Sequence, residues 1–170
     1  MPKIVHMVIG LPKSGKTYAR EHDGELSILP TLDLFDVQQA MGRKHLSRED
    51  ILESYQKALD ELLELLEQYD EVVFEHTFVR TIRRPMYLDE VRRRYPDCRI
   101  VCHYVHPPLD EYRRRKNGEN HDEIVGAFRE IAGKTGRKFI DVSSIYDKLN
   151  HEMFDIPTIE EGFDEVIAIN

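Results

Sequence analysis

A segment of eight residues near the start of the chain, Gly10–Thr17, restricts the possible folds more than any other part of the sequence. It reads GLPKSGKT, which matches the pattern GxxxxGK followed by Ser or Thr, and it follows an apolar run at residues 4–9 that is typical of a buried strand. The two glycines permit a tight turn whose backbone N–H groups point at one anion, and the helix expected to follow adds the positive end of its dipole. We therefore predict a strand, loop and helix that bind the phosphates of a nucleotide. The alternative is a glycine turn that binds none.

The side chains of this loop have separate expected roles. The Lys16 ammonium should reach the β- and γ-phosphates, and the Thr17 hydroxyl should be a ligand of Mg²⁺. At Lys13 and Ser14 the backbone matters more than the side chain. The predicted nucleotide-binding residues are Gly10, Pro12, Lys13, Ser14, Gly15, Lys16 and Thr17.

Short apolar runs alternate with helical stretches along the rest of the chain. After the first run, we expect strands at about residues 26–29, 72–74, 99–105 and 166–169. Their apolar character is continuous rather than alternating, which is typical of strands that are buried on both faces of a parallel sheet. The predicted fold class is therefore α/β, with a parallel sheet of about five strands and helices on both faces.

The longest predicted helix covers about residues 47–69, because Ser47 and Asp50 resemble a capping box and leucines recur at helical spacing after them. Further helices are expected at about residues 82–94, 109–116, 122–132 and 143–153, the last of them with Ser143 as its cap.

Length and composition bound the class of protein. The 170 residues, 41% of them hydrophobic, suffice for one domain with a packed core, so we expect a single domain over residues 1–170. No apolar run approaches the roughly 18 residues that a spanning helix needs, which predicts a cytoplasmic protein with no membrane partner. Cys98 and Cys102 should be buried thiols, too far apart along one strand for a disulfide. The histidines show no metal spacing, so no structural metal is expected.

Basic residues are concentrated in one part of an otherwise acidic chain. The net charge is −8, yet residues 79–116 contain eleven basic side chains against five acidic ones. This concentration can create a focused positive field that attracts phosphates. Alternatively, the guanidinium groups of Arg92, Arg93 and Arg94 only solvate helix faces. The first alternative predicts a phosphate-bearing partner despite the net negative charge.

Three segments outside the loop carry further motifs. Residues 72–78 read VVFEHTF and precede several arginines, residues 107–116 read PPLDEYRRRK, and residues 154–167 read FDIPTIEEGFDEVI. Together with the loop, they resemble the P-loop kinases related to the phage-type polynucleotide 5′-hydroxyl kinases. In that family the corresponding segments are a strand with an acidic residue and arginines after it, a helix that carries a lid arginine, and a tail before the last strand. The resemblance covers nearly the whole chain.

The resemblance implies a three-layer P-loop fold and an ATP- and Mg²⁺-dependent transfer of the γ-phosphoryl group to a hydroxyl of a nucleic acid or nucleotide, either a 5′ end or a hydroxylated base in DNA. It also implies an aspartate after the second strand that accepts the proton, which here is Asp33. Independently, a carboxylate at the carboxyl end of a strand lies where open α/β sheets bind ligands, and phosphoryl transfer needs a base near the incoming hydroxyl. Alternatively, Asp33 only caps a helix that begins at Leu34.

The acceptor side departs from the family pattern at one position. The family has an arginine three residues after the aspartate, where it binds the acceptor's phosphate, whereas this chain has Asp36. One of the arginines after the third strand can supply the missing charge if it points inward. The predicted acceptor-binding residues are therefore Asp36, Arg80, Arg83, Arg84 and Arg114.

A mobile lid is expected at about residues 113–142, where the chain is longer than the family pattern. Arg113 is the predicted lid arginine, with Arg114 and Arg115 as competitors, and such an arginine stabilises charge on the transferring group. A closed lid excludes water and suppresses ATP hydrolysis. Alternatively, the insertion is a surface elaboration, and one or two of the arginines only favour a helix dipole.

Glu75 follows an apolar strand at a position where an acidic residue can hold a Mg²⁺-bound water or orient Lys16. It equally fits a strand-end carboxylate that is paired with an arginine. The neighbouring His76 is expected to be a packed or rim histidine rather than a base. We therefore predict Thr17 and Glu75 at the metal, and Lys16, Asp33 and Arg113 as the catalytic residues.

Two other functions fit the same motifs. A kinase for a small metabolite, such as a nucleoside, sugar or antibiotic, would use Asp36 to hydrogen-bond an acceptor hydroxyl. A nucleotide-binding regulator with weak ATPase activity would need the glycine loop but not Asp33. The sequence contains no NKxD motif of the guanine-binding type, and it does not separate these alternatives further.

Overall fold

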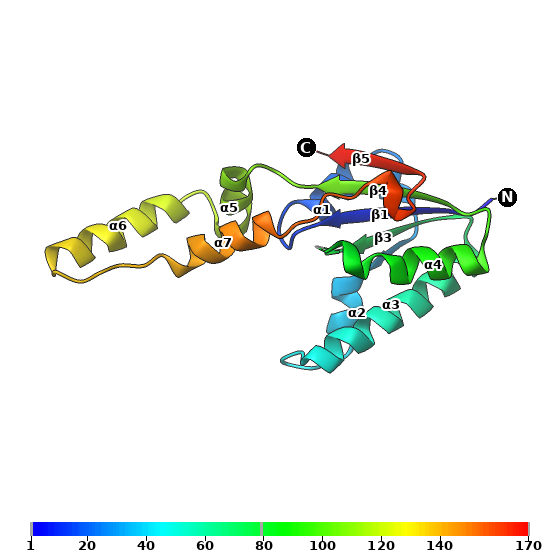
Figure 1. Ribbon diagram of the computed structural model, residues 1–170, viewed down its shortest axis with the longest axis horizontal. Helices are drawn as coiled ribbons and strands as arrows, with labels where there is room; N and C mark the ends of the chain where they lie inside the picture. The colour runs from blue at the N-terminus through cyan, green and yellow to red at the C-terminus, as the bar shows by residue number, and fades with distance from the viewer. Residues whose placement is uncertain (1, 79, 170) are drawn as a thin grey trace.

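A sheet of five parallel strands lies at the centre of the computed structural model, which describes residues 2–78 and 80–169 (Figure 1). The strands are β1 (Ile4–Gly10), β2 (Thr31–Asp33), β3 (Glu71–His76), β4 (Arg99–Val105) and β5 (Glu165–Ile169). They lie in the order β2-β3-β1-β4-β5, so the first strand of the chain is central. All carboxyl ends of a parallel sheet lie at one edge, where ligands bind in open α/β folds. The α/β fold and the parallel sheet are confirmed.

The register of the central strands brings the predicted site residues to one level. Val8 of β1 pairs with Glu75 of β3, and Glu75 in turn pairs with Asp33 of β2. Gly10, the last residue of β1, pairs with Val105 at the end of β4. The glycine loop and the two carboxylates therefore come from neighbouring strands at the same edge of the sheet.

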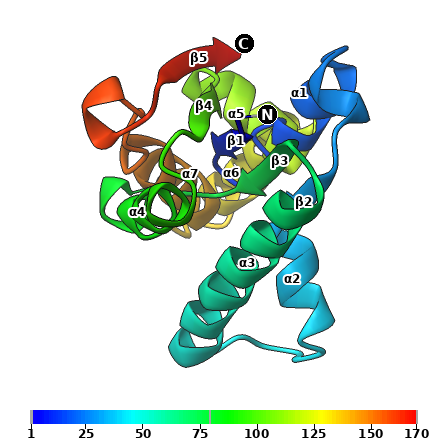
Figure 2. The ribbon, with the colours of Figure 1, turned by 90° about the vertical axis from the view of Figure 1, so that its right-hand side faces the viewer.

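Helices cover both faces of the sheet (Figure 2). One face carries α3 (Arg48–Gln68) and α4 (Pro85–Arg94), and the other carries α1 (Lys16–His22) and the 3-10 helix η1 (Leu26–Ile28). The main core lies under α3 and α4 and includes Val5, Met7, Ile9, Leu62, Leu66, Phe74, Leu88 and Val91. A smaller cluster on the second face consists of Val8, Leu26 and Val73, with Leu29 packed against it. Alternate residues of β1 thus pack on opposite faces.

Local sequence signals set the ends of several helices. Ser47 and Asp50 form the predicted capping box, in which the Asp50 N–H donates to Ser47 Oγ over 3.1 Å and the Ser47 N–H donates to Asp50 Oδ2 over 2.8 Å. α4 begins at Pro85 rather than at Ile82, because a separate 3-10 turn, η2 (Thr81–Arg83), precedes it and proline favours the first helical position. A short helix, α2 (Leu34–Ala40), follows β2.

The predicted strand at residues 26–29 is wrong, because this segment forms η1 and the second strand lies further along the chain. The segment is apolar because Leu26 and Leu29 pack on the second face of the sheet. The Asp23 carboxylate accepts hydrogen bonds from the backbone N–H groups of Glu25 and Leu26, each over 2.9 Å. Such local side-chain bonds favour a turn over a strand.

Three helices form an arm, residues 109–152, that projects beyond the carboxyl ends of the strands (Figure 1). They are α5 (Leu109–Asn117), α6 (His121–Lys134) and α7 (Val142–Glu152). α7 packs against α5, whereas α6, which is described throughout, buries none of its residues. The cap of α7 is Asp141 rather than the predicted Ser143, because Asp141 Oδ1 accepts a hydrogen bond from the Ser144 N–H over 3.0 Å.

Cys98 and Cys102 are buried free thiols, as expected. Burial raises the pKa of the Cys98 thiol to about 11 and that of the Cys102 thiol to about 12, so both are protonated at neutral pH. In the part of the chain that the structure describes, no helix has both the length and the apolar composition that crossing a membrane requires.

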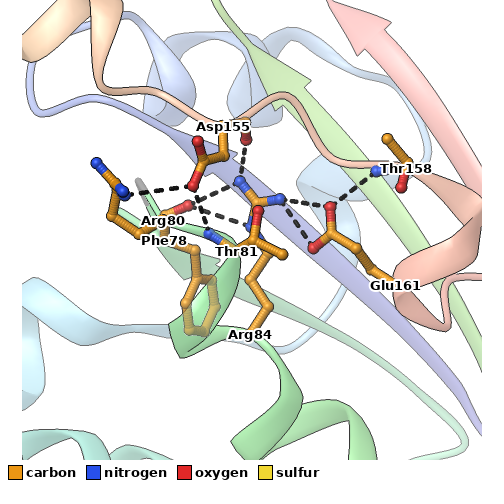
Figure 3. Close-up of polar contacts among 7 residues, drawn as sticks. All are labelled: Phe78, Arg80, Thr81, Arg84, Asp155, Thr158 and Glu161. Carbon is orange, nitrogen blue, oxygen red and sulfur yellow. Dashed lines mark hydrogen bonds and ion pairs between the residues drawn. The ribbon is translucent and has the colours of Figure 1, made fainter.

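Arg84 joins the start of α4 to the tail before β5 (Figure 3). Its side chain is fully buried, and Nη1 donates to the two carboxylate oxygens of Glu161 over 2.7 and 2.9 Å. Nε and Nη2 donate to the Phe78 carbonyl over 3.3 and 3.1 Å, and Nη2 also donates to the Asp155 carbonyl. All five N–H groups of the guanidinium are therefore engaged. Arg84 has a structural role instead of the predicted role in acceptor binding.

Replacing Glu161 tests this network. The substitution Glu161→Gln leaves the buried Arg84 guanidinium without its counter-charge, and we expect it to lower the free energy of unfolding by about 3 kcal/mol. Urea denaturation followed by circular dichroism measures the change. The control Glu90→Gln removes an exposed partner of Arg93 and should leave the unfolding curve unchanged. Equal effects of the two substitutions would contradict a structural role for the buried pair.

Candidate nucleotide-binding and phosphoryl-transfer site

The glycine loop connects β1 to α1 and contains two residues with positive φ, Lys13 at 60° and Gly15 at 103°. A Cβ at Gly10 would lie 2.7 Å from both Ser14 Oγ and the Val105 carbonyl oxygen, so only glycine fits there. Alternating backbone conformations of this kind turn successive N–H groups toward one concave surface that accepts anions. Ser14 Oγ is buried and, among the described residues, has no hydrogen-bond partner. The loop thus has the geometry of a phosphate-binding turn.

The Lys16 ammonium lies inside the loop. Its side chain is buried, and Nζ donates to the Leu11 carbonyl over 2.9 Å. Burial lowers the pKa of Lys16, while the charges of Glu75 and Asp33 oppose this shift. An ammonium has three N–H donors, so the contact with Leu11 leaves two for the oxygens of a phosphate.

Glu75 holds α1 against β3, and its contacts confirm the pairing with an arginine, while a role at the metal stays a prediction. Its carboxylate is only 3% exposed, and it accepts a hydrogen bond from Thr17 Oγ1 over 2.5 Å. The other carboxylate oxygen accepts from Arg20 Nε over 3.1 Å, an ion pair. Glu75 is therefore an arginine-paired strand-end carboxylate that also touches the predicted metal ligand. Arg20 is a site residue that the sequence analysis misses, although its place one turn after Thr17 on the same helix could identify it.

Asp33 has two functions in the geometry of the site. Its Oδ1 accepts a hydrogen bond from the Phe35 N–H over 2.8 Å, so the carboxylate caps α2. It also lines a cleft of about 430 Å³ together with Lys16 and Thr17 of the loop and Glu75 of β3. Partial burial raises the pKa of Asp33, the Phe35 N–H opposes this shift, and the nearby Glu75 adds to it. The helix cap is confirmed, whereas the role of Asp33 as a base stays a prediction; the carboxylate lies at the wall of the cleft.

The donor set of the loop fits a magnesium nucleotide. Mg²⁺ prefers hard oxygen ligands and usually binds through one or two protein groups, phosphate oxygens and water. The Thr17 hydroxyl and the Glu75 carboxylate supply such oxygens next to the Lys16 ammonium. Another cavity at the loop, of about 530 Å³, is lined by Lys13, Gly15, Lys16, Thr17, Tyr18 and Arg115. Its size suits the rest of a nucleotide.

Arg115, rather than Arg113, lies on the glycine loop. Arg115 Nη1 donates to the Ser14 carbonyl over 2.6 Å. Arg113 points to α7 instead, where Nη2 donates to the Ser144 carbonyl over 3.0 Å. Arg114 is exposed and pairs with an acidic residue of its own helix. In this structure Arg115, one of the two competitors, contacts the glycine loop and Arg113 contacts α7, so Arg115 is better placed to be the lid arginine.

Most other arginines of the basic segment 79–116 belong to surface ion pairs. Val79 of this segment lies outside the described residues. The pairs are Arg92 with Asp164, Arg93 with Glu90, Arg94 with Glu67 and Arg99 with Glu165. They lie at the end of α4 and the start of β4, at the edge of the sheet opposite the glycine loop. For Arg92, Arg93 and Arg94 the alternative of a solvated helix face holds, because each pairs with an acidic residue away from the cleft.

Some of the predicted acceptor-binding residues lie at a cavity near the cleft, and others do not. Arg80 and Arg83 line a cavity next to the cleft, and Arg80 Nε also pairs with Asp155 over 3.3 Å. Asp36 is exposed on α2, one turn after Asp33, whose pKa its charge helps to raise. Arg114 pairs with Glu111 and lines neither the cleft nor this cavity. Of the predicted set, only Arg80 and Arg83 therefore lie at a cavity that adjoins the cleft.

Comparison with solved structures agrees with this architecture. A candidate kinase from Chloroflexus aurantiacus superposes with a TM-score of 0.66 at 16% identity, over 99% of this chain and 87% of that chain. Shikimate kinase from Acinetobacter baumannii, in complex with shikimate, gives 0.51 at 16% identity over 100% and 85% of the two chains. A chain of the Pnkp1/Rnl/Hen1 RNA repair complex gives 0.55 at 18% identity over 90% and 46%. The chain therefore has the P-loop kinase fold. No family model and no curated protein matches its sequence.

Substituting the arginines of α5 tests which one serves the nucleotide. Arg115→Ala removes a guanidinium from the loop, and we expect it to weaken binding of a magnesium nucleotide by about tenfold or more. Isothermal titration calorimetry with Mg²⁺ and a non-hydrolysable ATP analogue measures this change. The matched control Arg114→Ala should change the affinity by less than about twofold, because its ion pair is exposed. A larger loss for Arg113→Ala than for Arg115→Ala would restore Arg113 as the lid arginine.

Proposed function

We propose that the protein is an ATP- and Mg²⁺-dependent kinase that transfers the γ-phosphoryl group to a hydroxyl of an acceptor. The observation that carries this proposal is the convergence of the Lys16 ammonium, the Thr17 hydroxyl and the Asp33 carboxylate on one cleft at the carboxyl edge of the sheet. A phosphate cradle alone would suit any nucleotide-binding protein. A half-buried carboxylate across the cleft from the cradle is what transfer to an alcohol needs in addition.

The residues of the loop act on the donor. Free backbone N–H groups of the glycine loop and the Lys16 ammonium bind the phosphates and stabilise the negative charge of the transferring group. The Thr17 hydroxyl and the Glu75 carboxylate would hold Mg²⁺, which would supply positive charge to neutralise the phosphates. Arg115 of the arm, which is paired with Glu111, brings its guanidinium to the backbone of the loop. In the transfer, the bond from the γ-phosphorus to the bridging oxygen of ADP breaks and a bond to the acceptor oxygen forms.

Asp33 acts on the acceptor. In our proposal the proton of the acceptor hydroxyl passes to the Asp33 carboxylate as the new P–O bond forms. Burial raises the pKa of this carboxyl, which makes the ionised form a stronger base than an exposed aspartate. The hydrogen bond from the Phe35 N–H orients the carboxylate, so the capping role and the catalytic role support each other.

The first candidate for the acceptor is a hydroxyl of a nucleotide or of a nucleic-acid end. Arg80 and Arg83 support it because they place positive charge beside the cleft, and one structural neighbour belongs to an RNA repair complex. The second candidate is a small metabolite. It is favoured by the ion pairs of Arg92, Arg93 and Arg94, which leave no basic track for a long strand along α4, and by the likeness to shikimate kinase.

Replacing Lys16 tests the donor side. Lys16→Ala removes the charge that contacts the phosphates, and we expect the affinity for magnesium ATP to fall by about tenfold or more, with a large loss of turnover. Calorimetry and a coupled ADP assay measure the two quantities. Lys57→Ala, on the exposed side of α3, serves as the control. Unchanged turnover in Lys16→Ala would remove this residue from the mechanism.

Asp33→Asn tests the reaction itself. Asparagine caps helices as well as aspartate does, so the fold and the binding of ATP should be retained, while turnover should fall by about 10²- to 10⁴-fold. Transfer of label from [γ-³²P]ATP is measured with a panel of oligonucleotides, nucleotides and small alcohols. Because Asp33 must be ionised and its pKa is raised, kcat/KM should rise with pH with a midpoint above 3.8, the usual value for aspartate. ATP-dependent behaviour that survives Asp33→Asn, with no labelled acceptor, would indicate a regulator instead.

A further inference from the structure

A second cavity of about 430 Å³ lies beside the transfer cleft, between α3, the segment after β3 and the helices α5 and α7. It shares the wall residues Pro12, His76 and Thr77 with the cleft that contains Asp33. A molecule in this cavity can therefore extend past Thr77 toward the carboxylate of Asp33. The volume lies in the range of small-molecule sites.

The wall of this cavity is positively charged, although the protein as a whole carries −8. Arg80, Arg83 and Lys116 line it, and no carboxylate is among its described lining residues. Arg80 and Lys116 each have an acidic partner behind the wall, Asp155 and Asp147. Arg83 has no ion-pair partner within residues 2–78 and 80–169. Its guanidinium thus supplies a net positive charge at the cavity.

His76 presents an unused hydrogen-bond donor at the same wall. Its Nδ1 accepts a hydrogen bond from the Phe78 N–H over 2.9 Å, so the proton of the neutral ring is on Nε2. The ring is 3% exposed and stacks on Phe78 with a centroid distance of 3.4 Å. Burial holds the pKa of His76 well below its usual value, which keeps the ring neutral.

Nε2 is buried and, in the described part of the chain, has no partner. A buried N–H without an acceptor is costly, and such groups in native proteins call for a ligand or water as partner. Because His76 lies in the wall common to both cavities, an oxygen of a bound molecule can satisfy this donor. This observation is independent of the charge of the arginines.

We propose that this cavity binds the acceptor, and that the acceptor is a small alcohol that carries a phosphate monoester or a carboxylate. The anionic group lies at Arg83 and Arg80, the His76 Nε2–H donates to one of its oxygens or to a neighbouring hydroxyl, and the reacting hydroxyl reaches Asp33. Tyr55 and Tyr112 form apolar walls, and side chains of α5 and α7 bound the outer side. A polymer would have to enter by its end. This inference rests on the proposed kinase function and narrows its acceptor.

Matched pairs of probes test the charge requirement. Adenosine is compared with adenosine 5′-monophosphate, and glucose with glucose 6-phosphate and gluconate, each by calorimetry on the protein saturated with Mg²⁺ and a non-hydrolysable ATP analogue. We expect at least one anionic probe to bind about tenfold or more tightly than its neutral partner. The two kinds of anion separate a phosphate site from a carboxylate site. Failure of every anionic probe to bind would overturn the proposal.

Substitutions test the roles of Arg83 and His76 in binding the anionic probe. Arg83→Gln, at an exposed position, should abolish the preference for the anionic probe. The control Arg93→Gln, at the far end of α4, should retain this preference. His76→Gln keeps an N–H donor and should bind the probe more tightly than His76→Phe, which fills the space without a donor. If the histidine variants do not fold, NMR of the wild-type protein replaces them: the probe should shift the His76 Nε2–H resonance, and an unchanged resonance would overturn the role of His76.

The outcomes separate this inference from the kinase function. If magnesium ATP binds and Asp33-dependent label appears only on oligonucleotide 5′ ends, the kinase function stands and the small anionic acceptor is refuted. Equal affinity for the anionic and neutral probes, or an anion preference that survives Arg83→Gln, also refutes the assignment of the cavity. If magnesium ATP does not bind at all, the kinase function itself fails.

Discussion

The hydrogen bond between the Thr17 hydroxyl and the buried Glu75 carboxylate is the contact on which the site depends, because it joins the glycine loop to the neighbouring strand. Glu75 is in register with Asp33 on its other side, so one carboxylate connects the phosphate cradle to the expected base. A buried carboxylate needs partners, and Arg20 supplies a positive charge that pairs with Glu75. The distance between cradle and base is thereby set by the sheet, whose strand spacing is rigid, and not by a flexible loop.

Some arginines of this chain are buried and structural, and others are exposed. Their positions determine where positive charge is available to bind an acceptor. Arg84 is buried against Glu161 and fixes the start of α4. These contacts also hold the neighbouring segment that carries Arg80 and Arg83. The arginines at the far end of α4 neutralise acidic neighbours at the surface. The positive charge that is left near the cleft is therefore local, which suits an anionic group at one point better than a long polyanion.

The arm contributes to the site through α5 and α7. Arg115 of α5 contacts the backbone of the glycine loop, and α7 packs on α5 and supplies part of the outer wall of the second cavity. A displacement of these two helices would change both the donor and the acceptor side at once. α6 has no such contact, and its apolar side chains Ile124, Phe128 and Ile131 are exposed.

Most of the fold could be predicted from the sequence, because it depends on local patterns. The glycine loop determined its own turn, since Gly10 has no room for a Cβ and Gly15 needs a positive φ, and the capping box of Ser47 and Asp50 determined the start of α3. The apolar run at residues 26–29 was misassigned because a short buried turn and a short buried strand have the same composition.

Only the tertiary structure decided which arginines face the site. The direction of Arg113 and Arg115 follows from the rotation of α5 on its neighbours, and Arg84 is buried because Glu161, 77 residues away in the sequence, lies opposite it. Charge and spacing along a chain cannot determine such contacts, because they depend on how separate elements pack in space.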